Sequence, residues 1–149
     1  MTDPSAEPRQ ASPLTLRTSE GGEAAVGNFW REVGGRETFE RLVRAFYAGV
    51  ASDPPLLALY PETDLEPAIQ RLTGFLEQYW GGPTAYSDAR GHPRLRMRHA
   101  PFAVTPDMRD RWLTHMRTAV DSLGLAPLQE AMLWGYLERA AHAMVNRLE

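Results

Sequence analysis

The sequence predicts an all-α protein with one main domain. Apolar residues recur with helical spacing in several long segments, no segment alternates convincingly between apolar and polar residues, and proline and glycine clusters separate the segments. A chain of 149 residues with 43% hydrophobic content can bury a single core, and it shows no internal repeat. We therefore expect one helical domain over residues 27–149.

Residues 1–26 differ in character from the rest of the chain. They are rich in Pro, Ser, Thr, Glu and Gly and show no sustained apolar period. Such a segment buries too little apolar surface to offset the entropy lost on ordering, so we expect a flexible N-terminal extension. Phe29, Trp30 and Val33 then form a short apolar segment that ends at Gly34 and Gly35.

The first long helix is expected from the residues after Gly35 to the Asp53-Pro54-Pro55 segment, because proline disfavours helical backbone in the residue before it. Its apolar positions follow the spacing i, i+3, i+4, i+7, i+8 and i+11, which makes one continuous stripe facing a core. These positions are Phe39, Leu42, Val43, Phe46, Tyr47 and Val50.

The second long helix is expected from about Leu65 to Trp80. Tyr60-Pro61 interrupts the chain before it, so Tyr60 lies in a corner between helices, and the Asp64 carboxylate is a suitable N-cap. Gly81-Gly82-Pro83 ends the helix. Its wide apolar face carries Ala68, Ile69, Leu72, Phe75, Leu76 and Tyr79.

The segment from Thr84 to Val104 has no clear period and is expected to be irregular. Long irregular segments inside compact domains are usually functional. Arg90, Arg94, Arg96 and Arg98 form a basic cluster here, which could bind carboxylate or phosphate groups or could belong to a solvated loop.

Two further helices complete the domain. Thr105 caps the first, Pro106 occupies its first turn, and it runs to about Leu123 before Gly124. The last runs from about Pro127 to Arg147. The apolar faces comprise Met108, Trp112, Met116, Ala119 and Leu123 on the first, and Leu128, Met132, Leu133, Tyr136, Leu137, Ala140 and Met144 on the second.

Charge and composition exclude several classes of function. A net charge of −3 and a pI near 5.8 give no basic excess for binding nucleic acid or an anionic membrane. With no cysteine, the chain can form neither a disulfide nor a thiolate metal site, and it cannot attach a c-type haem. No secretory leader and no apolar run long enough for stable membrane insertion is present, so we expect a cytoplasmic protein.

The histidines and acidic residues give no clear catalytic pattern by themselves. His115 and His142 are expected to face solvent, His92 precedes a proline in the irregular segment, and His99 from its spacing alone is better interpreted as structural. No zinc-protease, nucleophile-elbow, P-loop or dinucleotide motif is present. The remaining candidates, Glu37, Glu40, Glu66 and Glu77, are expected on solvated helix ends and outer faces.

The run from Phe75 to Phe102, FLEQYWGGPTAYSDARGHPRLRMRHAPF, resembles the signature of the group II truncated haemoglobins, the "O" type of bacteria. The similarity extends from about Phe29 to Asn146 through VGGRETF, FYAGV, LYPETDL, RWLTHM and AAHAMVN. This resemblance implies a two-over-two helical truncated globin fold around a non-covalent haem b.

By matching position, His99 resembles the proximal iron ligand, and Arg96 and Arg98 would reach the haem propionates. On the distal side the resemblance brings together Tyr47, Tyr60 and Trp112, whose O–H and N–H groups can hydrogen-bond a ligand that gains negative charge, as oxygen does on ferrous haem. The implied pocket comprises Tyr47, Tyr60, Ala68, Leu72, Phe75, Leu76, Arg96, Arg98, His99, Phe102 and Trp112.

The resemblance leaves three functions to compare. The favoured one is a haem protein that binds oxygen, and also nitric oxide, carbon monoxide or peroxide, and releases oxygen slowly. The alternative is a redox enzyme, a nitric oxide dioxygenase or a peroxidase, which would need an external reductase because the chain has no flavin or nicotinamide domain. The third is a helical interaction module without cofactor, and either a monomer or a homodimer is compatible with the sequence.

Overall fold

The computed structural model describes residues 29–91 and 94–148, except for the side chain of Arg96, and it contains only helices and loops there. Residues 29–32 begin it with a helical turn. The following helices are α2 (Arg36–Ala51), α3 (Pro54–Leu57), α4 (Glu66–Tyr79), α5 (Ala85–Arg90), α6 (Leu95–His99), α7 (Pro106–Asp121) and α8 (Pro127–Met144). The predicted all-α class and the long helices are confirmed, with ends shifted by a few residues.

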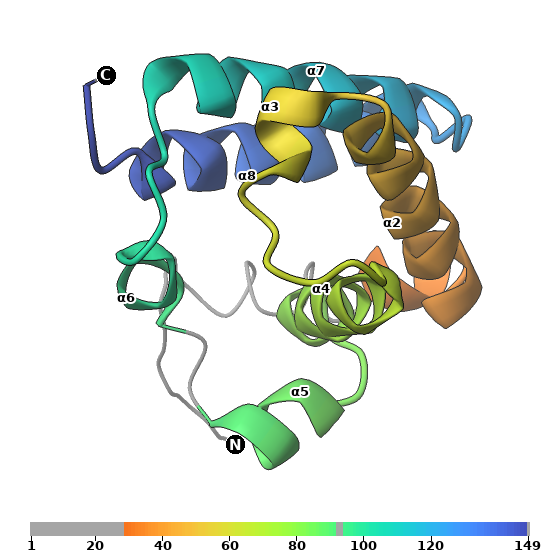
Figure 1. Cartoon of the computed structure of the whole chain (residues 1–149). Coiled ribbons are helices and arrows are strands. Elements are labelled where there is room, and N and C mark those ends of the chain that lie inside the picture. The colour runs from red at the N-terminus through yellow and green to blue at the C-terminus, as the bar shows by residue number, and fades with distance from the viewer. Residues whose placement is uncertain (1–28, 92–93, 149) are drawn as a thin grey trace.

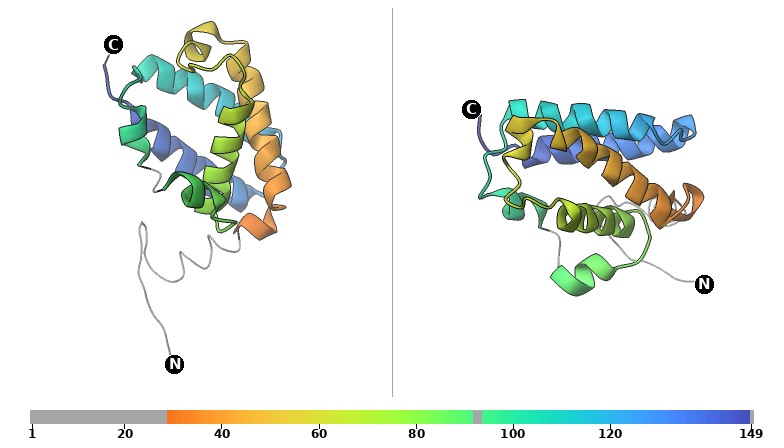
Figure 2. Two further views of the ribbon diagram at one scale, coloured as in Figure 1. Left: turned by 60° about the horizontal axis from the view of Figure 1, so that its bottom comes forward. Right: turned by 45° about the vertical axis from the view of Figure 1, so that its right-hand side comes forward.

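The long helices form two pairs that enclose the middle of the molecule. Helices α7 and α8 lie side by side, while α2 packs against both α4 and α7 (Figure 1). Further views show α4 separated from the α7–α8 pair, with α5 below it on the outside (Figure 2). This is the two-over-two arrangement that the resemblance implied.

The inner face of α2 contributes a continuous stripe to the core. All six predicted stripe residues of this helix are buried, Phe39 and Val50 among them. At Gly49 the helix approaches α7 so closely that a Cβ atom there would lie 2.4 Å from the His115 Nδ1 atom. A side chain at position 49 would therefore displace the His115 ring or separate the two helices.

Three sequence expectations about the helices are wrong. The segment from Thr84 to Val104 holds α5 and α6, which are too short to show a period. Leu128 was expected in the core but is 73% exposed, because it lies in the first turn of α8 and the buried positions begin at Leu133. The N-cap of α4 is Leu65; the Asp64 carboxylate instead accepts a hydrogen bond from the Glu66 N–H at 3.0 Å.

Glu77 also contradicts its expected position on a solvated surface, since it is only 3% exposed. Its carboxylate accepts hydrogen bonds from the Arg36 guanidinium at 2.7 Å and from the Trp30 indole N–H at 3.3 Å. These partners come from segments far away in the sequence, so its burial could not be recognised from periodicity. The contacts compensate for the loss of water around the charge.

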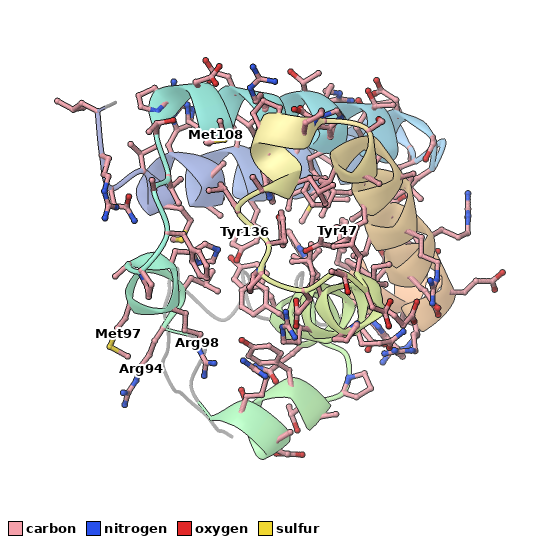
Figure 3. The ribbon with its side chains drawn as sticks, in the orientation of Figure 1. Tyr47, Arg94, Met97, Arg98, Met108 and Tyr136 are labelled. Atoms are coloured by element: carbon pink, nitrogen blue, oxygen red, sulfur yellow. The ribbon has the colours of Figure 1, made fainter. Side chains whose placement is uncertain are left out.

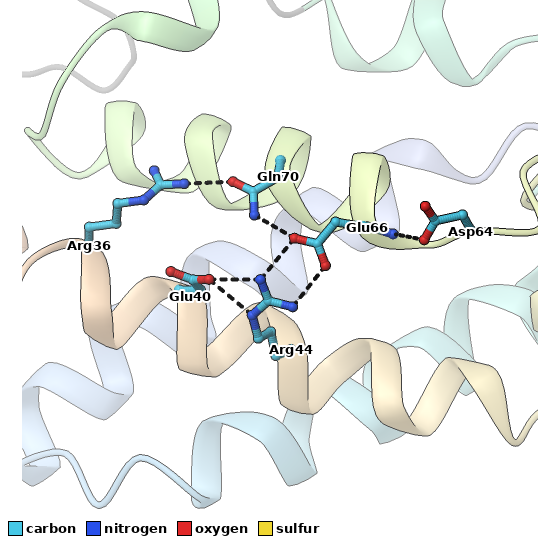
Figure 4. A network of polar contacts seen from close by, with 6 residues as sticks. All are labelled: Arg36, Glu40, Arg44, Asp64, Glu66 and Gln70. Carbon is cyan, nitrogen blue, oxygen red and sulfur yellow. Dashed lines mark hydrogen bonds and ion pairs between the residues drawn. The ribbon is translucent and has the colours of Figure 1, made fainter.

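A polar network ties the outer faces of α2 and α4 together (Figure 4). Arg44 on α2 is held between Glu40 at 2.8 Å and Glu66 of α4 at 2.9 Å. Gln70 donates to Glu66 at 2.8 Å and accepts from Arg36 at 2.7 Å. Helices α2 and α4, which both contribute to the site below, are thus joined at the surface as well as through the core.

Candidate functional site

A cavity of about 430 Å³ lies between the helix pairs, a volume that suits a small organic ligand or cofactor. Its walls are mostly apolar and come from all of the helices α2 to α8 and from the loops between them. The predicted pocket residues that line it are Tyr47, Tyr60, Ala68, Leu72, Phe75, Leu76, Arg98, His99, Phe102 and Trp112. The side chain of the remaining one, Arg96, lies outside the described residues.

His99 ends the short helix α6, rather than lying in the irregular loop that was expected. Its Nδ1 atom is 2.8 Å from the carbonyl oxygen of Leu95 one turn earlier. A carbonyl oxygen can only accept, so Nδ1 carries the proton in this hydrogen bond. In the neutral ring with this tautomer, the lone pair lies on the other nitrogen, Nε2, which is suited to bind a metal ion.

The backbone that follows His99 is fastened by Asn146, just beyond α8. The Asn146 amide donates to the carbonyl oxygens of His99 at 3.2 Å and of Phe102 at 3.0 Å. Its side-chain oxygen accepts from the Val104 N–H at 3.0 Å, and its own N–H donates to the Val104 carbonyl at 2.9 Å. One residue thus satisfies several backbone groups in a segment with little secondary structure of its own.

Tyr47, Tyr60 and Trp112 form a second group of polar side chains on the cavity wall. The Tyr60 hydroxyl interacts with the Tyr47 hydroxyl and with the Trp112 indole N–H, and the indole N–H can act only as a donor. The two phenol rings lie edge to face with centroids 5.5 Å apart. Burial raises the pKa of both tyrosines, so each remains a neutral hydrogen-bond donor across the physiological range.

The wall contributed by α4 carries no hydrogen-bond donor in its side chains at Ala68, Leu72 and Phe75. Ala68 is 3% exposed and its small side chain leaves space on this side of the cavity. The polar contacts available to a small ligand therefore concentrate on the tyrosine and tryptophan cluster described above.

Arginines gather at the polar edge of the cavity. Arg98 lies close to Tyr86, with its guanidinium carbon 6.0 Å from the ring centroid, and Arg90 lies 5.8 Å from the same centroid. Arg71 also lines the cavity and pairs with Glu62 at 3.0 Å. The sequence identified Arg98 and included Arg90 in its basic cluster, but it missed Arg71, because helical periodicity assigns a charged residue to the solvent face.

The other histidines take no part in the cavity wall among the residues that the structure describes. His115 was expected to face solvent, but its Nε2 atom lies 2.8 Å from Asp53, because α7 packs against the segment around α3. Arg111 binds the same carboxylate at 2.9 Å, and these contacts lower the Asp53 pKa, His115 having the larger effect. His142 is exposed as expected, and His92 lies outside the described residues.

The side chains present fit a haem. An imidazole nitrogen is available to an iron ion, apolar walls suit a flat macrocycle, and arginines at the edge suit its carboxylates. Sequence comparison gives an independent result: the model of the family "Bacterial-like globin" matches residues 28–146.

This chain belongs to the bacterial-like globins.

Among known proteins, this globin is similar to the group 2 truncated hemoglobin YjbI of Bacillus subtilis, with 43% identity over 115 residues that cover 77% of this chain and 86% of the relative. A thermostable hemoglobin from Thermobifida fusca has a similar structure, with a TM-score of 0.80 and 61% identity, over 81% of this chain and 98% of the other. A truncated oxygen-avid haemoglobin from Bacillus subtilis gives a TM-score of 0.74 and 41% identity, over 79% and 98%.

These matches place the globin in group II of the truncated haemoglobins, whose members bind haem b. The expected family, fold and cofactor are therefore confirmed. Within the described part of the chain, no helix combines the length and apolar character needed to cross a membrane.

Proposed function

We propose that this globin binds oxygen and other small diatomic ligands tightly and releases oxygen slowly. When bound, haem supplies an iron that coordinates such ligands. His99 would hold the iron through Nε2, with Arg98 and its neighbours at the carboxylate edge. Tyr47, Tyr60 and Trp112 would contact the ligand from the distal side.

The observation that carries this proposal is the meeting of three hydrogen-bond donors on one part of the cavity wall, at Tyr47, Tyr60 and Trp112. Each tyrosine offers a phenol O–H and Trp112 offers an indole N–H, so a ligand in the cavity can accept hydrogen bonds from this cluster. Tyr47 is buried and the other two side chains are half-buried, so little water competes for the ligand.

A single hydrogen bond from this cluster is strong enough to control the rate at which a ligand is released. A hydrogen bond to a charged group contributes about 1.5–3 kcal/mol. Since about 1.4 kcal/mol changes an equilibrium constant tenfold, one such bond corresponds to roughly tenfold to a hundredfold slower release if association is unchanged. The oxygen-avid Bacillus subtilis relative, at 41% identity, supports the same interpretation. Slow release suits a protein that retains oxygen until a second reactant arrives.

The test is the oxygen dissociation rate of the haem-loaded protein. We expect slow release in the natural protein and release faster by about tenfold or more in Trp112→Phe, which lacks the indole N–H. Trp134→Phe is a matched control, because Trp134 packs under Arg117 and does not line the cavity. Equal rates in the natural protein and Trp112→Phe would overturn the proposal.

A further inference from the structure

A triangle of aromatic rings connects the cavity with the half-buried side of α4. Tyr136 of α8 lines the cavity, and its ring stacks on Tyr79 with centroids 4.0 Å apart and an interplanar angle of 23°. Trp80 contacts Tyr79 edge-on at 5.1 Å and Tyr136 at 5.9 Å. Trp80 is 4% exposed, whereas Tyr79 is only half-buried. Tyr136 points toward the middle of the molecule between α8 and α4 (Figure 3).

The cluster of Tyr47, Tyr60 and Trp112 includes none of these three rings. Its own ring contacts join Tyr47 to Tyr60 and, through Phe46, to Trp112. All of these rings line the cavity or are buried in the core. Within the described residues, the Tyr136 triangle is therefore a separate ring-to-ring connection that leaves the cavity on another side.

Tyrosine and tryptophan rings are the side chains of this protein that are best suited to lose a single electron. The chain has no cysteine, so no thiol competes with them for oxidation. Tyr86 also lines the cavity, but the guanidinium groups of Arg90 and Arg98 lie over its ring. Their positive charge opposes the removal of an electron from Tyr86. Tyr136 instead has two oxidisable rings in direct contact.

We propose that Tyr136, Tyr79 and Trp80 form an electron relay that lets a small phenolic reductant at the Tyr79 edge supply electrons when peroxide reacts in the haem pocket. This inference rests on haem binding and is independent of slow oxygen release.

The electrons and atoms balance as follows. Hydrogen peroxide takes two electrons and two protons, its O–O bond breaks, and two waters form. The haem would supply one of these electrons when His99 holds it. The tyrosine pair supplies the other together with one phenol proton, and the second proton comes from solvent. One phenol then returns a hydrogen atom to the oxidised tyrosine, and a second phenol replaces the other electron and releases its proton to solvent.

The experiment locates the oxidised side chain directly. Haem-loaded ferric protein is mixed with hydrogen peroxide and a nitroso spin trap, and the trapped residue is identified by peptide mass spectrometry. We expect an adduct on Tyr79 in the natural protein, its loss in Tyr136→Phe, and its retention in the control Trp134→Phe, because Trp134 does not line the cavity. Adducts confined to Tyr47, Tyr60 or Tyr86, or no adduct at all, would overturn the relay.

A Tyr79 adduct that persists unchanged in Tyr136→Phe would overturn the route through Tyr136. The visible absorption spectrum of each variant is recorded first to establish haem binding. If Tyr136→Phe does not retain haem, Tyr79→Phe decides the matter through peroxide-driven oxidation of an added phenol. The relay requires a loss of that oxidation in Tyr79→Phe and not in Trp134→Phe, and equal rates in the natural protein and Tyr79→Phe would refute it.

Discussion

The His99 Nδ1 atom lies 2.8 Å from the carbonyl oxygen of Leu95, within the same five-residue helix. This bond fixes the ring orientation and the tautomer before any metal is present, because it places the proton on Nδ1. The fold therefore orients the imidazole before a metal ion binds, and in the neutral ring Nε2 is the nitrogen available as a ligand.

Removing this imidazole should abolish normal haem binding. We expect His99→Gly to lose the Soret spectrum of the natural protein, and added imidazole to restore it by occupying the vacated space. His142→Gly is the control, because His142 is exposed on α8. A natural Soret spectrum in His99→Gly without imidazole would show that another group holds the iron.

Tyr60→Phe should release oxygen faster than the natural protein. The substitution keeps the ring and its contact with Tyr47 but removes the hydroxyl that interacts with Tyr47 and Trp112 and that can donate to the ligand. The expected increase in the dissociation rate is about tenfold, in keeping with the loss of one hydrogen bond to a charged acceptor. Slower release in Tyr60→Phe would mean that Tyr60 competes with the ligand for the other two donors.

Asn146→Ala should loosen the proximal side of the pocket. It removes the amide hydrogen bonds to the carbonyl groups of His99 and Phe102, which keep their other donors, at a cost of about 0.5–1.5 kcal/mol in unfolding free energy for each bond lost. We expect faster transfer of haem to an acceptor protein as well as lower stability. Leu148→Ala, at a residue that is 84% exposed, should change neither quantity.

Gly49→Ala should destabilise the α2–α7 contact, because its methyl group would overlap the His115 ring. We expect a loss of about 1–3 kcal/mol in unfolding free energy, typical of overpacking. His115→Ala also loses the bond to Asp53, but it should make the added methyl group tolerable. The two substitutions should therefore be non-additive in a double-mutant cycle. Simple additivity would place the cost of the alanine elsewhere.

The surface network predicts a specific loss of stability in acid. Hydrogen bonds from Arg44, and then from Gln70, lower the pKa of Glu66 from 4.5 to about 2. A carboxylate with a lowered folded pKa contributes stability that is complete above its unfolded pKa and disappears as the pH falls through the folded one. Between pH 4.5 and 2, the unfolding free energy should therefore fall more steeply in the natural protein than in Glu66→Gln. Parallel curves would contradict this.

The sequence predicted the parts of the site that depend on regular helices. Tyr47 belongs to a stripe of buried residues, and proline places Tyr60 at a corner, so both could be located from spacing alone. His99 could not, because α6 has too few residues to show a period and its partner Asn146 is distant in sequence. Glu77 and His115 were misplaced for a related reason: their burial depends on a neighbouring helix.

The fastening of residues 99–104 by Asn146 also constrains the order of events during protein synthesis. Helices α2, α4 and α7 emerge from the ribosome before the residue that secures the proximal loop. Until α8 and Asn146 have been translated, the backbone around His99 lacks its long-range hydrogen bonds. Stable capture of the cofactor is thus expected to be a late step of biogenesis, after the distal half of the pocket has already been made.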